Sequence, residues 1–149
     1  MTHRYRRVPF HNMTHAFNVT HACFQLILTL KKEPLEAESG VESEGKNSNS
    51  LVKATLFSDL DILSMIIACI GHDLDHPGLG NTYYQKSSEY RAQTVNNASI
   101  LENYHTYVLL GLLNQSNVLA GLPNADNQYV RDLITHLILK TDMSQHFAL

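Results

Sequence analysis

The chain has 149 residues, a length that suits one domain with a substantial core. Hydrophobic residues make up 44% and charged residues 17%, which is typical of a folded globular protein and excludes an intrinsically disordered one. The formal net charge is −3 and no basic face is evident, so we predict no nucleic-acid partner.

The first residues and the two cysteines indicate a soluble cytoplasmic protein. The opening stretch, MTHRYRRVPFHN, lacks the apolar segment of a signal peptide, and the longest apolar runs are too short for a membrane span. Cys23 and Cys69 both lie in apolar helical runs. Buried free thiols explain them better than a disulfide, which favours a reducing compartment.

A first helix is predicted over residues 13–30, because Asn12 is a suitable N-cap for the apolar periodicity that follows. From residue 31 to about residue 55 the chain is rich in Glu, Ser, Gly and Asn. That composition buries too little apolar surface to order itself, so we predict a flexible insertion that joins two helices within one domain.

Ser58 and Asp61 predict the start of a second helix, which is apolar on every side and therefore central in the fold. Pro77 and Gly78 are expected to stop it. A polar loop with one short helix should follow.

Ser99 and Glu102 have the spacing of a capping box and predict a third long helix, and a last helix is expected over about 127–143. No segment alternates polar and apolar residues with the period of a strand. The predicted fold class is all-α.

The nine histidines are the unusual feature of the composition, and several of them gather near helix ends. His11 and His15 are four residues apart and should share one face of the first helix. His72 and Asp73 are expected at the end of the apolar second helix. Together His15, His72 and Asp73 offer a partial ligand set for zinc, provided that the helix frays so that adjacent residues can converge.

Each of these residues also has an ordinary structural explanation. His11 and His15 could be solvated, Asp73 could be a helix-end carboxylate, Glu102 could act only in capping, and Thr141 could lie on the surface. His105 lies one turn after Glu102. It could hold a metal ligand in place, or it could be an ordinary buried histidine. The cluster interpretation is favoured because several charged groups after a buried helix would be costly if they stayed unpaired.

The order of four motifs, PFHNMTHAFNVTH, HDLDHPGLGN, NNASILENYH and LILKTDM, resembles the class I cyclic nucleotide phosphodiesterases. The resemblance covers nearly the whole chain except the Glu/Ser-rich insertion. It implies a compact all-α domain of the HD superfamily with two divalent metals, normally Zn²⁺ with Mg²⁺ or Mn²⁺. The implied substrates are cAMP or cGMP, which are hydrolysed to the 5′-monophosphates.

The resemblance also implies residue roles. His11 matches the histidine that protonates the leaving 3′ oxygen. His15, His72 and Asp73 match zinc ligands, with Asp73 also bridging to the second metal. The residues that match groups holding metal-bound water are His76, Glu102 and Thr141, and Met143 matches a residue that faces the nucleotide pocket.

The chain departs from the family pattern at several places. Phe10 stands where the family usually has Tyr, and Tyr104 stands where it has His, which removes that histidine's hydrogen bond. The last zinc aspartate and the purine-binding glutamine of the family lie on later helices. We therefore expect a partial catalytic domain, incomplete at the C-terminus, that is inactive alone. A longer parent could add regulatory domains or dimerise. The alternatives are another HD-type metal phosphohydrolase, or a non-catalytic truncated product that binds partners.

Overall fold

The computed structural model describes residues 2–32, 56–87 and 89–144, and this part of the chain is helical without strands. A short 3₁₀ helix, η1 (Thr2–Arg4), precedes α1 (Met13–Lys32) and α2 (Asp59–Gly71). The predicted all-α class is confirmed. The expected insertion at about 31–55 lies almost wholly outside the described residues. Among them, no helix is both long and apolar enough to cross a membrane.

The N-terminus of α1 is capped as predicted. The Asn12 side-chain oxygen accepts the backbone N–H of Thr14 at 2.9 Å, and its own side-chain amide donates to the Val8 carbonyl at 2.9 Å. His11 therefore lies two residues before the helix instead of within its first turn.

The start of α2 is also as predicted, but its end differs. The Ser58 hydroxyl accepts from the Asp61 amide at 3.1 Å, and the Asp61 carboxylate accepts from the Ser58 amide at 2.8 Å, which is a complete capping box. The helix ends at Gly71, six residues before Pro77, because the chain turns at residues 72–75. Ending there frees the adjacent residues His72 and Asp73 from the helical register.

Two short helices, α3 (Asn81–Ser87) and α4 (Tyr90–Thr94), replace the single one expected before α5 (Ile100–Ser116). The capping box predicted at the start of α5 is wrong. Ser99 has a left-handed conformation with φ 44° and makes no side-chain cap. Its hydroxyl instead donates to the Asp142 carboxylate at 2.7 Å, a partner 43 residues away.

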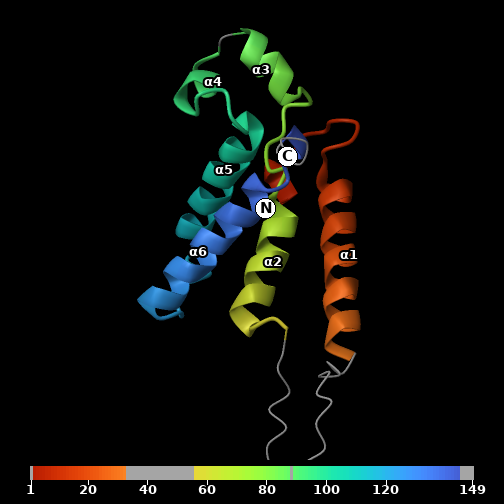
Figure 1. The fold of residues 1–149 in the computed structure, drawn as a ribbon, viewed down its shortest axis with the longest axis vertical. Helices are drawn as coiled ribbons and strands as arrows, with labels where there is room; N and C mark the ends of the chain where they lie inside the picture. Colours follow the sequence, from red (N-terminus) through yellow and green to blue (C-terminus); the bar gives the residue numbers. More distant parts are fainter. Residues whose placement is uncertain (1, 33–55, 88, 145–149) are drawn as a thin grey trace, which may run out of the picture.

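The last helix, α6 (Asn124–Leu139), begins and ends earlier than the predicted 127–143. In Figure 1 the long helices stand side by side in the order α5, α6, α2, α1, and α2 lies between α6 and α1. The central position predicted for α2 is confirmed. Neighbouring helices cover α2 only in part, as the 37% exposure of Leu63 shows.

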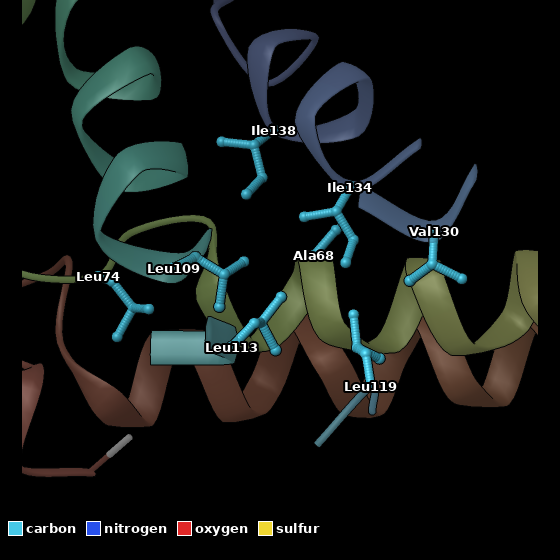
Figure 2. Packing of buried hydrophobic residues seen from close by; sticks show 8 residues of the cluster. All are labelled: Ala68, Leu74, Leu109, Leu113, Leu119, Val130, Ile134 and Ile138. Atoms are coloured by element: carbon cyan, nitrogen blue, oxygen red, sulfur yellow. The ribbon is translucent and has the colours of Figure 1, made fainter. Parts of the chain in front are cut away.

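The main core fills the space where α2, α5 and α6 meet. Figure 2 shows Ala68 of α2 close to Ile134 and Ile138 of α6. Leu74, from the turn that follows α2, is fully buried in the same cluster with Leu109. The segment that carries His72 and Asp73 is therefore anchored in the core by the residue next to them.

Candidate metal and catalytic site

A cavity of about 720 Å³ opens between α1, α2, α5 and the end of α6. Its walls include all eight of the residues that the sequence singled out: His11, His15, His72, Asp73, His76, Glu102, Thr141 and Met143. Helices far apart in the sequence thus bring the predicted site residues to one pocket. Buried apolar side chains also line it, among them Ala68, Leu101 and Ile138.

Three of these residues converge on one point. The Nε2 atoms of His15 and His72 lie 3.3 Å apart. The Asp73 Oδ2 atom lies 3.4 Å from His15 Nε2 and 3.2 Å from His72 Nε2. His72 and Asp73 are neighbours in sequence, and they reach the same point because α2 has already ended.

Backbone contacts fix the orientation of the His72 ring. His72 Nδ1 lies 2.8 Å from the Cys69 carbonyl oxygen. A carbonyl oxygen only accepts, so Nδ1 carries the hydrogen and donates it. In the neutral ring the lone pair is then on Nε2, which faces His15 and Asp73. A histidine held in this way is oriented as a metal ligand.

Asp73 is the electrostatic centre of the cluster. Burial alone would raise the pKa of Asp73, but the neighbouring imidazole of His72 outweighs burial and lowers this pKa. Burial likewise tends to lower the pKa of His72, and the carboxylate of Asp73 reverses the direction and raises it. For His15 burial prevails and its pKa is lowered. His72 and Asp73 thus each favour the charged form of the other.

This donor set fits a divalent cation. Among the described residues, the buried Asp73 Oδ2 makes no hydrogen bond although it faces two imidazole nitrogens. Two imidazoles and one carboxylate whose ligand atoms lie within 4.8 Å of one another match the ligand chemistry of zinc. A cation would compete with the proton on His72, since ligands bind metal in the deprotonated form.

His11 and His76 form a second part of the site. Their rings stack with centroids 4.0 Å apart. His76 Nδ1 accepts the Gly78 amide at 3.0 Å, so a neutral His76 carries its hydrogen on Nε2. One ligand atom each of His11, His76 and Asp73 also lie within 4.8 Å of one another. Asp73 thus belongs to both groups.

The remaining predicted residues line the pocket without joining these groups. Glu102 accepts a hydrogen bond from the Asn81 side-chain amide at 2.9 Å, and burial raises the pKa of Glu102. The Thr141 hydroxyl donates to the Ile138 carbonyl at 2.7 Å. Met143 is 62% exposed at the rim.

The sequence does not single out Asn81 as a site residue, and it leaves the role of His105 undecided. Asn81 was read only as part of a loop motif, but its Oδ1 accepts the Leu101 amide at 2.9 Å while its amide holds Glu102. It therefore caps α5 in place of Ser99. The Asn at the end of HDLDHPGLGN was the available signal. His105 is 2% exposed, and its Nε2 lies 3.9 Å from Asp73 Oδ1.

Comparison with known proteins gives this pocket its context. The family described as 3′,5′-cyclic nucleotide phosphodiesterase matches residues 10–149. The chain belongs to this family. The mouse high affinity cGMP-specific 3′,5′-cyclic phosphodiesterase 9A is 33% identical to it over 144 residues, which are 95% of this chain and 23% of that protein. The rat 3′,5′-cyclic-AMP phosphodiesterase 4C is 31% identical over 149 residues, 99% of this chain and 24% of that protein.

Solved structures agree with the phosphodiesterase assignment. The phosphodiesterase domain of the RhoPDE fusion protein from the choanoflagellate Salpingoeca rosetta superimposes with a TM-score of 0.78 at 29% identity. The match covers 97% of this chain and 39% of that domain's chain. This chain thus spans less than a quarter of the two curated relatives and about two fifths of the solved phosphodiesterase domain. Family membership implies the use of divalent metal ions.

Proposed function

We propose that this chain carries the metal-binding and proton-donating residues of a site that hydrolyses cAMP or cGMP to the 5′-monophosphate. The observation that supports it best is the convergence of His15, His72 and Asp73 on one point in a pocket that His11 also lines. The relatives named above act on cAMP or on cGMP, so the choice of base stays open in the proposal.

His15, His72 and Asp73 would hold Zn²⁺, and Asp73 would also contact a second ion, Mg²⁺ or Mn²⁺. When bound, two such ions supply Lewis acidity for the phosphate and lower the pKa of water. The presence of Asp73 in both three-residue groups supports its shared role.

The remaining pocket residues would donate a proton to the substrate, orient water or contact the nucleotide. His11 is placed to give a proton to the leaving 3′ oxygen as a general acid, a step typically worth about 10²–10⁴-fold in rate. Its stacking on His76 restricts the position of its ring. His76, Glu102 and Thr141 would orient water in the pocket, and Met143 would contact the nucleotide at the rim.

We further propose that residues 1–149 bind metal alone but do not turn over substrate. The chain corresponds to 39% of the chain of the solved phosphodiesterase domain that it matches. The family resemblance implies that the remaining metal aspartate and the purine-binding glutamine belong to later helices. A cytoplasmic role in cyclic-nucleotide signalling, with regulatory or dimerising regions in a longer parent, is part of the same proposal.

The direct test is a chimaera in which residues 1–149 replace the matching segment of the Salpingoeca rosetta phosphodiesterase domain. Release of 5′-AMP and 5′-GMP is measured with zinc and magnesium supplied. We expect hydrolysis by the chimaera and none by residues 1–149 alone. In the chimaera, His11→Ala should lose most of the turnover and keep its metal, and Asp73→Asn should lose metal.

His21→Ala is the matched control for these variants. His21 is an exposed histidine of α1 that does not line the pocket, so its loss should change neither metal content nor turnover. A folded, metal-loaded chimaera without hydrolysis would contradict the proposal. If His11→Ala strips the metal, the role given to His11 is wrong.

A further inference from the structure

Asp75 is the point at which three separate parts of the chain meet, and it lies outside the pocket lining. Its backbone has φ 59°, in the left-handed region that non-glycine residues rarely adopt. Asp tolerates this conformation better than most residues, but surrounding contacts must still hold it there. Asp75 belongs to the turn that carries His72, Asp73 and His76.

The first contact comes from the N-terminal segment. Arg6 binds both carboxylate oxygens of Asp75, with Nε–Oδ1 at 2.6 Å and Nη2–Oδ2 at 3.0 Å. The Asp75 amide donates to the Arg4 carbonyl at 3.0 Å. This two-pronged geometry fixes direction as well as distance, which a single ion pair does not. The Arg6 side chain is 45% exposed, so the ion pair adds little to the free energy of folding. Its main effect is to orient the Asp75 carboxylate.

The second contact comes from α5. The Tyr104 hydroxyl donates to Asp75 Oδ2. The guanidinium of Arg91 lies over the Tyr104 ring, 4.1 Å from its centre. Tyr104 is one of the two residues named above that depart from the family pattern. Its hydroxyl reaches the carboxylate, and Arg91 contacts a face of its ring.

We propose that Arg6 and Tyr104 are positioning residues that clamp Asp75 and so fix the turn at residues 72–76. Leu74 is fully buried and anchors the inner side of this turn in the core. The Asp75 clamp, meaning Arg6, Asp75 and Tyr104, holds its outer side. With both sides fixed, Asp73 and His76 keep their directions into the pocket.

The importance of the clamp for metal binding rests on the proposed function, whereas its effect on the turn does not. The test therefore measures the turn itself in the metal-free chain, residues 1–149, by hydrogen exchange at the backbone amides of residues 73–78 other than Pro77. Tyr104→Phe removes only the hydroxyl and its one hydrogen bond, and Arg6→Ala removes the guanidinium and its two exposed ones. Each variant should speed exchange at these amides about tenfold, the order expected for losing a hydrogen bond to a charged group.

The matched controls are Tyr107→Phe and Arg7→Ala. Tyr107 is a tyrosine of α5 with 76% exposure, and Arg7 is the exposed neighbour of Arg6. Neither should change exchange in the turn. Core amides of α6 should exchange at the wild-type rate in all four variants, which separates a local clamp from a general loss of stability. Zinc affinity, measured by titration, should fall several-fold in Tyr104→Phe and Arg6→Ala alone.

The clamp is overturned if exchange at residues 73–78 is unchanged in Tyr104→Phe and Arg6→Ala, or if it rises equally throughout the chain. If exchange rises only in the turn while even the wild-type chain binds no zinc, the clamp stands and the proposed metal site fails. If zinc binds and exchange in the turn does not change, the metal site stands and the clamp fails.

Discussion

Two histidine rings near Asp73 are oriented by backbone carbonyl groups. His72 donates from Nδ1 to Cys69, and His105 donates from Nδ1 to the Leu74 carbonyl at 2.7 Å. Both contacts leave Nε2 on the side of Asp73, at 3.2 Å for His72 and 3.9 Å for His105. The two pKa values shift in opposite directions, because Asp73 outweighs burial at His72 whereas burial prevails at His105. Burial lowers the pKa of His105 to about 4, although Leu74 and Asp73 act in the opposite direction.

His105 should make the metal-free chain sensitive to acid. Its pKa is lowered on folding, so between the unfolded value near 6.5 and the folded value of about 4 the unfolded chain binds more protons. The free energy of unfolding therefore falls as the pH falls from 6.5 to 4, by up to about 3 kcal/mol for this group. Urea denaturation at pH 7.5, 6 and 5 in the presence of a chelator measures it.

His105→Gln isolates this contribution, because a glutamine amide can donate to the Leu74 carbonyl but does not titrate. The variant should lose less stability than the wild-type chain over the same pH interval. Equal losses in both proteins would show that His105 is not the group responsible.

At the scale of elements, the end of α2 is set by close packing against α5. A Cβ atom added at Gly71 would lie 2.5 Å and 2.8 Å from the two methyl carbons of Leu109. Leu109 is fully buried in the core, so its side chain would have to shift against packed neighbours to admit the methyl group. The glycine thus allows α5 to pack closely against the last residue of α2, directly before His72 and Asp73.

Gly71→Ala should destabilise the chain by about 1–3 kcal/mol, the usual cost of overpacking a core. It should also weaken zinc binding, since the displaced backbone leads directly into His72 and Asp73. Urea denaturation and zinc titration of residues 1–149 test the two effects.

Gly111→Ala in α5 is the control, because a Cβ atom there meets nothing within 4 Å. Alanine is favoured over glycine inside a helix, so this variant should gain up to about 1 kcal/mol and bind zinc normally. If Gly71→Ala is as stable as Gly111→Ala, the packing explanation for Gly71 is wrong.

Helix starts were predicted correctly where the capping side chain bonds to a residue nearby in the sequence. Asn12 and the Ser58–Asp61 pair bond within a few residues, and the starts of α1 and α2 were predicted from them. Ser99 carried the same kind of signal, but its hydroxyl bonds to Asp142, 43 residues away. That partner is visible only in the folded chain, as are the stacking of His11 on His76 and the contact of Tyr104 with Asp75. The grouping of the site residues could be predicted because their motifs resemble those of a known family. Their individual roles stay predictions.

In the whole molecule, α1 and α2 run side by side in opposite directions, and the site lies at one end of the pair. In Figure 1 the start of α1 and the end of α2 lie at the same end of this pair, and the end of α1 and the start of α2 lie together at its lower end. The end of α1 and the start of α2 are therefore remote from the pocket. α1 packs mainly against α2, and Phe17 and Phe24 on it are 61% and 46% exposed.

Replacing residues 34–50 by a short Gly/Ser linker should leave zinc affinity and the midpoint of thermal unfolding nearly unchanged. The end of α1 and the start of α2 lie far from the site, and each doubling of loop length changes the closure free energy by only about 0.6 kcal/mol. Calorimetry of residues 1–149 with and without the replacement measures the unfolding midpoint, and titration measures zinc affinity. A large loss of either would show that the segment contacts the site or the core.

The core residues that bury Leu74 come later in the chain than the proposed metal ligands, which sets an order of events during synthesis. His15, His72 and Asp73 are all translated by residue 73, before Leu109, Ile134 and Ile138 exist to bury Leu74. Chains emerge from the ribosome N-terminus first, so a nascent chain presents the ligands before the core that fixes their geometry. We therefore expect the proposed metal ligands to reach their final geometry only when α6 is complete.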